Sequence, residues 1–166
     1  MKKLIFLLLI TLTLNCCDDD DSSSQDPIDQ LPPETQTGEN TFAYLLNGEL
    51  VNITNTPNQF AIYQGGGVQF GGGGVFIVAL DPFDINITYQ FMDISEGTSR
   101  ARYTSQVSEN TFCLYEYGDT YEGYVRFTNI DTENFIISGT FEYSTIREGC
   151  QDINITNGRF DLQYIP

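Results

Sequence analysis

Alternation of apolar and polar residues is the feature that most constrains how this chain folds. Residues two apart share one face of a β-strand, so such alternation predicts a half-buried strand. In DINITYQFMD (84–93) the residues of one face are Ile85, Ile87, Tyr89 and Phe91. The pattern returns in GTFEYSTI (139–146) and GRFDLQYIP (158–166). No window of ten or more residues beyond residue 40 shows an apolar stripe at helical spacing, so we expect essentially no helix there.

Turn signals separate the alternating segments. Asn47-Gly48 and Asn157-Gly158 each lie between two apolar runs, and Asn-Gly favours the type I′ turn of a hairpin. The strands that we expect, about nine, are 41–47, 58–63, 75–80, 84–93, 100–105, 111–117, 123–130, 139–146, and 152–156 leading into the last segment. Short connections require antiparallel neighbours. The sequence therefore predicts an all-β fold, either an antiparallel β-sandwich or a barrel-like sheet.

The stretch QGGGVQFGGGGVF (64–76) is unusually rich in glycine. A phosphate-binding loop of the Walker type ends in Lys-Ser or Lys-Thr and opens a helix, and this stretch has neither. We expect a mobile hairpin tip or a bulged edge strand here.

Residues 1–16 have the features of an export signal. Two lysines precede an apolar run of eleven residues from Leu4 to Leu14. As a helix this run spans about 16 Å, roughly half of a bilayer core, which suits a signal peptide better than a transmembrane span. Leu14-Asn15-Cys16-Cys17 resembles the lipobox of bacterial lipoproteins, in which a cysteine receives a diacylglycerol. We expect lipidation at Cys17, with Cys16 as the alternative.

Residues 17–40 are acidic and contain few apolar side chains. Four aspartates follow the cysteines, and the rest of the segment holds one isoleucine, one leucine and three prolines. Because such a composition buries too little apolar surface to offset the entropy of ordering, we expect a disordered acidic tether that leads to an all-β domain at 41–166. The acidic run also resembles the surface-export signal of Bacteroidota lipoproteins, which implies an outer-membrane or cell-surface location.

The charged residues exclude several classes of function. Seven Lys and Arg stand against 23 Asp and Glu, the net charge is −16, and the chain has no histidine. Nucleic-acid binding requires a basic stripe, which this chain lacks. Without histidine, and with lysines only at positions 2 and 3, it also lacks the usual base of a serine or cysteine nucleophile. We expect no catalytic residues, no cofactor, no metal site and a non-enzymatic domain.

The two remaining cysteines, Cys113 and Cys150, form an even pair in a chain that we expect to be exported. Oxidising compartments favour disulfides, so we predict a bridge between them. Two reduced cysteines, buried separately, are the alternative.

Four tyrosines around one acidic turn form a candidate binding patch for a protein or glycan partner. They are Tyr115, Tyr117, Tyr121 and Tyr124. Tyrosines mixed with carboxylates suit such a patch, although tyrosines at strand ends also pack at sheet margins. The nearby acids leave open a carboxylate-dependent glycan hydrolase, which needs two carboxylates about 5–10 Å apart across a hollow. A lipocalin-like carrier of a small ligand would need an interior cavity instead.

The two ends of the mature chain also carry a resemblance. IDQLPPETQTGENTFAYLLNGELV (28–51) and IISGTFEYSTI with DINITNGRFDLQY (136–146 and 152–164) resemble the ends of a Bacteroidota, flavobacterial-type lipoprotein family with an all-β domain of unknown function. The resemblance implies an exported, membrane-anchored protein and brings no catalytic residues. We therefore expect a lipid-anchored envelope lipoprotein with a binding or structural domain.

Overall fold

The computed structural model describes residues 26–54, 56–83, 91–109 and 111–166, and they form two packed antiparallel sheets. The order of the first sheet is β2-β1-β11-β10-β9-β6, with β1 (Thr41–Leu46), β2 (Glu49–Ile53), β6 (Met92–Asp93), β9 (Thr120–Asp131), β10 (Ile136–Thr145) and β11 (Ile153–Gln163). The order of the second is β3-β4-β5-β7-β8, with β3 (Gln59–Gln64), β4 (Gly67–Gly72), β5 (Val75–Leu80), β7 (Arg100–Ser108) and β8 (Thr111–Tyr115). Three short 3-10 turns complete the fold: η1 (Pro27–Gln30), η2 (Thr56–Asn58) and η3 (Tyr117–Asp119).

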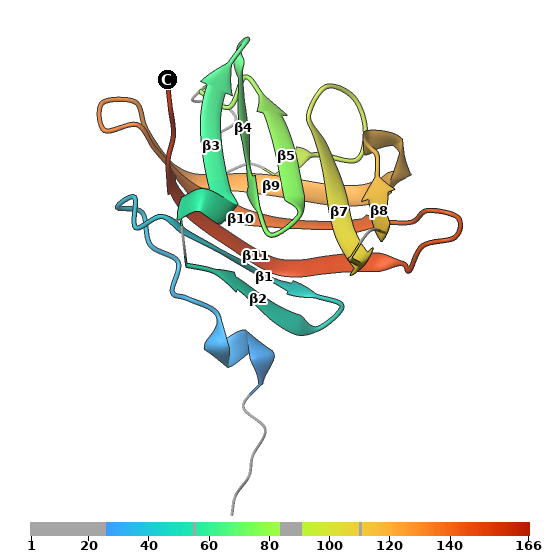
Figure 1. Ribbon diagram of the computed structural model, residues 1–166. Coiled ribbons are helices and arrows are strands. Elements are labelled where there is room, and N and C mark those ends of the chain that lie inside the picture. Colours follow the sequence, from blue (N-terminus) through green and yellow to red (C-terminus); the bar gives the residue numbers. More distant parts are fainter. Residues whose placement is uncertain (1–25, 55, 84–90, 110) are drawn as a thin grey trace, which may run out of the picture.

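The strands of the two sheets cross steeply, as β3, β4, β5 and β7 stand upright in Figure 1 while β9, β10 and β11 run across behind them. This is the arrangement of an orthogonal sandwich. At one corner Tyr63 N–H donates to Ile165 O at 2.7 Å and Ile165 N–H donates to Ala61 O at 2.9 Å, which ties the end of the chain to β3. The sheets do not close into a barrel, so the sandwich of our two expected architectures is confirmed. Residues 84–90 of the expected strand 84–93 lie outside the described residues.

Aromatic rings fill the space between the sheets. Phe42 stacks on Phe141 with ring centroids 5.1 Å apart, and Phe70 lies 4.5 Å from Phe160. A buried hydroxyl needs a partner, and the Tyr44 hydroxyl donates to Gly73 O at 2.6 Å. These rings occupy the space between the sheets where a lipocalin-like carrier would hold its ligand.

The two Asn-Gly pairs behave differently. Asn47 and Gly48 have φ values of 51° and 88° and connect β1 to β2, as predicted for a type I′ turn. The hairpin expected at Asn157-Gly158 is wrong, because β11 runs through this pair as one strand and its register against β1 and β10 shifts there. Asn157 has a φ of 53°, so the pair makes a β-bulge, which uses the same positive φ as a turn.

The glycine-rich stretch is not an edge strand. Its middle part is β4, which pairs with both β3 and β5, and Val68 and Phe70 are fully buried in it. Gly71 is required because a Cβ there would lie 2.0 Å from Val75 O. The expectation of a bulged edge strand is therefore wrong, because glycine here allows close contact between neighbouring strands.

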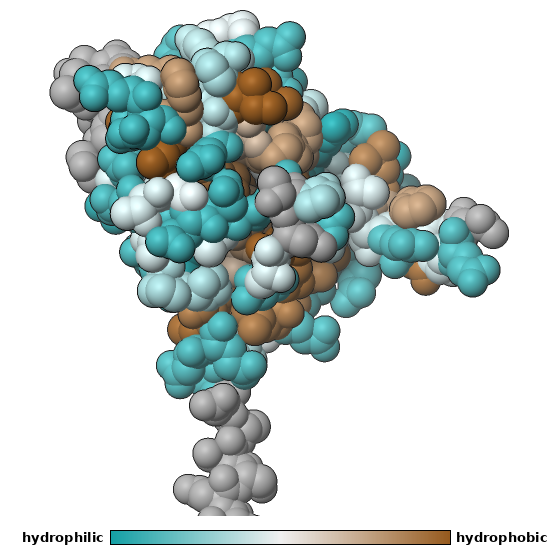
Figure 2. All heavy atoms as spheres, turned by 60° about the vertical axis from the view of Figure 1, so that its left-hand side comes forward, coloured by the Kyte–Doolittle hydropathy of each residue, from teal (hydrophilic) through white to brown (hydrophobic). Residues whose placement is uncertain are grey.

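The ordered chain begins before residue 41. Residues 31–40, which we call the strap, lie against the outer face of the six-stranded sheet, where Leu31 packs with Ala43, Leu45 and Leu50. Figure 2 shows a group of hydrophobic residues at the lower end of the body. Residues 26–40 thus differ from the disordered tether that we expected, although their composition is polar.

One buried carboxylate explains why this polar segment is ordered. Asp161 is 1% exposed and accepts five hydrogen bonds. The donors are the Thr35 hydroxyl at 2.7 Å, the backbone N–H groups of Thr37 at 3.1 Å, Gly38 at 2.9 Å and Glu39 at 3.1 Å, and the Ser138 hydroxyl at 2.7 Å. The acid of β11 therefore holds the strap in place.

Candidate functional site

The structure does not bring the four tyrosines of the candidate patch together. Tyr115 is buried and its hydroxyl donates to Gln151 O, whereas Tyr121 is 61% exposed. Tyr117 contacts Phe76 of the five-stranded sheet. Tyr124 lies on β9 of the six-stranded sheet. The two half-buried tyrosines, Tyr117 and Tyr124, therefore belong to the surfaces of different sheets.

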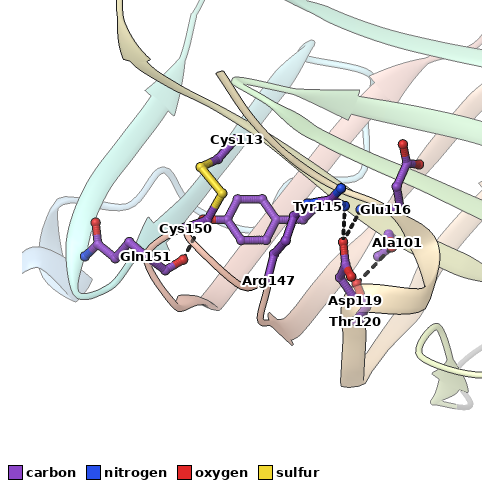
Figure 3. Close-up of polar contacts among 9 residues, drawn as sticks. All are labelled: Ala101, Cys113, Tyr115, Glu116, Asp119, Thr120, Arg147, Cys150 and Gln151. Atoms are coloured by element: carbon purple, nitrogen blue, oxygen red, sulfur yellow. Dashed lines mark hydrogen bonds and ion pairs between the residues drawn. A yellow bond between two sulfur atoms is a disulfide. The ribbon is translucent and has the colours of Figure 1, made fainter. Parts of the chain in front are cut away.

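Figure 3 shows the network around η3, the 3-10 turn whose first residue is Tyr117. Cys113 and Cys150 form the predicted disulfide, which joins β8 to the β10–β11 connection. Asp119 Oδ2 accepts from Glu116 N–H at 2.7 Å and from Arg147 at 2.8 Å, which ties η3 to the same connection. These contacts hold Tyr117 at the margin of the sheet, beside β7.

A row of aromatic residues crosses the outer face of the five-stranded sheet. Phe60 of β3 and Phe76 of β5 both lie opposite Gly71 of β4. Since Gly71 has no side chain, the two rings meet above it, with centroids 5.4 Å apart. The guanidinium carbon of Arg102 lies 4.4 Å from the Phe76 centroid and 5.5 Å from that of Tyr117. We call these four side chains, Phe60, Phe76, Arg102 and Tyr117, the aromatic platform.

A surface hollow of about 300 Å³ lies beside the aromatic platform, and we call it the platform hollow. This volume is at the lower end of the range for small-ligand sites. Its lining comes from η2, β3, the β4–β5 turn and β7: Pro57, Asn58, Gln59, Phe60, Gly72, Gly73, Gly74, Val75, Phe76, Arg102 and Thr104. Among the described residues, the lining contains one cation and no carboxylate, although the chain has 23 acidic residues.

Cation–π contacts hold Arg102 in place without using its N–H groups. Among the described residues Arg102 makes no ion pair and donates no hydrogen bond. By contrast, Arg147 pairs with Asp119 at 2.8 Å and Arg159 pairs with Glu34 at 3.8 Å. The platform hollow therefore presents a positioned guanidinium whose donors are available to a ligand.

A second hollow, of about 390 Å³, lies on the outer face of the six-stranded sheet. Glu122, Tyr124 and Glu142 line it, and Tyr124 pairs directly with Glu142 across β9 and β10. Partial burial raises the pKa of Tyr124, and the nearby charge of Glu142 raises it further. The Tyr124 ring also packs against Phe91, with centroids 4.6 Å apart. We call this group the carboxylate hollow.

Sequence reasoning named Tyr117 and Tyr124 as candidates, but it did not name the residues that surround them in the two hollows. The unbroken apolar run 75–80 could have indicated an apolar outer surface, because a strand with one face in water usually alternates apolar and polar residues. Its outward-facing residue Phe76 lies in the aromatic platform. Nothing in the sequence placed Phe60 or Arg102 beside it, because that depends on strand order. Within the described ranges, no group of side chains is arranged to hold a metal ion.

Comparisons with known proteins leave the site to be interpreted from its own geometry. No protein-family model, curated protein or solved structure matches this chain.

Proposed function

We propose that this protein is a lipid-anchored lipoprotein of the outer membrane or cell surface, whose β-sandwich binds a ligand without converting it. The leader followed by Cys17 supports the anchor. No helix among the described residues is long and apolar enough to span a bilayer. The observation that carries the binding role is the platform hollow, where Arg102 lies on aromatic rings and, as far as the described residues go, no ion pair engages it and no acid lines the wall.

The strap supports a particular placement of the domain. Eight residues lie between Cys17 and Asp26, where the described chain begins, and the nine Cα–Cα steps from one to the other span at most about 30 Å when extended. The chain then follows the outer face of the six-stranded sheet. The aromatic platform is on the opposite sheet, so an anchor at Cys17 leaves it accessible.

A second candidate function rests on the carboxylate hollow. Glu142 pairs with Tyr124 and Ser144 pairs with Glu122, so the two glutamates are diagonal neighbours on one face. Diagonal positions of an antiparallel pair are about 7–8 Å apart, so the carboxyl groups of two glutamates there can approach within the roughly 5–10 Å separations of glycosidases. This geometry favours a glycan hydrolase as the alternative to binding.

One assay separates the two functions. The full lipidated chain in detergent is incubated with a panel of oligosaccharides, and both bound and cleaved ligand are measured. Our proposal expects ligand to be retained uncleaved, with retention lost in Arg102→Gln and kept in Glu142→Gln. Cleavage that disappears in Glu142→Gln and persists in Arg102→Gln would establish the hydrolase instead.

A further inference from the structure

We propose that the aromatic platform binds a saccharide that carries a carboxylate, such as a uronic-acid sugar. This inference rests on the proposed binding function and adds the chemical class of the ligand. Binding such a saccharide requires three features of the platform hollow: local positive charge, an apolar surface for a sugar ring, and polar groups for the sugar hydroxyls.

The charge distribution favours an anionic ligand. A net charge of −16 disfavours anions over most of the surface, and both hollows that lie on the six-stranded sheet around Tyr124 contain glutamates. In the part of the chain that the structure describes, the platform hollow has Arg102 and no acid. A guanidinium can bind a carboxylate through two parallel hydrogen bonds. The guanidinium of Arg102 donates no hydrogen bond to any described residue. The hollow is therefore locally complementary to a single carboxylate.

The rings provide the apolar surface. Phe60 and Phe76 meet over Gly71, with an angle of 38° between their planes. Part of the neighbouring wall is formed by Gly72, Gly73 and Gly74, which have no side chains to cover the rings. Aromatic faces pack against the C–H groups of a sugar ring, and the volume of about 300 Å³ suits a ligand of one or two rings.

Polar groups complete the lining. Asn58 and Thr104 contribute an amide and a hydroxyl. Gln59 is 7% exposed, its Nε2 donates to Asn40 O at 2.6 Å, and its Oε1 has no hydrogen-bond partner among the described residues. Gln59 lies between this hollow and the seam where the chain end meets β3.

The test measures binding of oligogalacturonate to the full lipidated chain in detergent by titration calorimetry. Its methyl ester has the same rings without the charge, so the comparison isolates the carboxylate on the unaltered protein. We expect the ester, and the Arg102→Gln variant with the free acid, to bind at least about tenfold more weakly. Arg102→Lys keeps the charge but loses the planar donor pair, so we expect an intermediate affinity.

The matched control is Arg126→Gln. Arg126 also lies over an aromatic ring, at 5.5 Å from Phe91, but it belongs to β9 of the other sheet. We expect this variant to bind oligogalacturonate as the unaltered chain does. Equal loss in both variants would show that overall charge, and not the platform, determines affinity.

Three further outcomes of these experiments would contradict the proposal. Equal binding of acid and ester overturns the carboxylate inference and leaves the binding module standing. Equal competition by inorganic phosphate or by anionic vesicles overturns it in favour of a general anion site. Cleavage of the oligosaccharide overturns the proposed function itself.

Discussion

Replacing Asp161 with asparagine tests how the strap is held. The Oδ1 atom accepts from Gly38 N–H and from the Ser138 hydroxyl, and Oδ2 accepts from Thr35, Thr37 and Glu39. The least disruptive placement of the new NH₂ group is at Oδ1, because the Ser138 hydroxyl can rotate to accept, while Gly38 N–H loses its acceptor. The remaining hydrogen bonds also weaken because their acceptor is now neutral. Together with the lost bond to Gly38 N–H, this should lower the free energy of unfolding by about 3 kcal/mol.

The pH dependence follows from the same contacts. Burial alone would raise the pKa of Asp161, but the hydrogen bonds from Ser138, Thr35, Glu39 and Gly38 outweigh it and lower the pKa below its usual value. A carboxyl whose pKa is lower in the folded state stabilises the protein above the pKa of the unfolded chain, about 3.9, and this contribution is lost as the pH falls through the folded-state pKa. The stability difference between the unaltered chain and Asp161→Asn should therefore be constant from pH 7 to about pH 5 and shrink below about pH 4.

Urea unfolding of the full chain at several pH values measures the difference, and digestion with a Glu-specific protease reports on the strap. Asp161→Asn should be cut faster after Glu34 and Glu39. Asp131→Asn is the control, because Asp131 accepts comparable hydrogen bonds in an exposed turn, and we expect a loss below about 1 kcal/mol. An Asp161→Asn variant with the unfolding midpoint and cleavage rate of the unaltered chain would refute the account of the strap.

Two further predictions concern the frame of the platform. Reduction of the Cys113–Cys150 bridge, which closes a 37-residue separation, should lower the free energy of unfolding by about 4 kcal/mol, and an unchanged urea midpoint after reduction would contradict this. Gly71→Ala should cost more than about 2 kcal/mol and weaken ligand binding, because its Cβ would lie 2.0 Å from Val75 O and separate β4 from β5. Gly118→Ala, which meets nothing within 4 Å, is the matched control, and equal midpoints for the two variants would be inconsistent with this packing.

Much of the fold was predictable because it depends on local patterns. Alternation identified the strand at 139–146, and Asn47-Gly48 marked a real turn because both residues adopt positive φ. Asn157-Gly158 carries the same local signal but forms a bulge, because the residues on both sides pair with the same two neighbouring strands. Local propensity cannot separate a turn from a bulge, since both need the same backbone angles.

The site depends on contacts between distant parts of the chain. The composition of the strap predicted disorder, because composition contains no information on distant hydrogen-bond partners. The strap is ordered by Asp161, which lies more than 120 positions away in the sequence. Arg102 reaches Phe76 and Phe60 only through the strand order β3-β4-β5-β7. The sequence singled out Tyr117 by its spacing to other tyrosines, but its neighbours in the aromatic platform became visible only in three dimensions.

The central claim is that a lipid on Cys17 holds this sandwich at a membrane. Cells that express the unaltered chain, Cys16→Ser, Cys17→Ser or the double variant are labelled with radioactive palmitate and fractionated. The account predicts label and membrane retention in the unaltered chain and in Cys16→Ser, and loss of both in Cys17→Ser and in the double variant. Membrane retention of the double variant, or an unaltered chain without label, would contradict it.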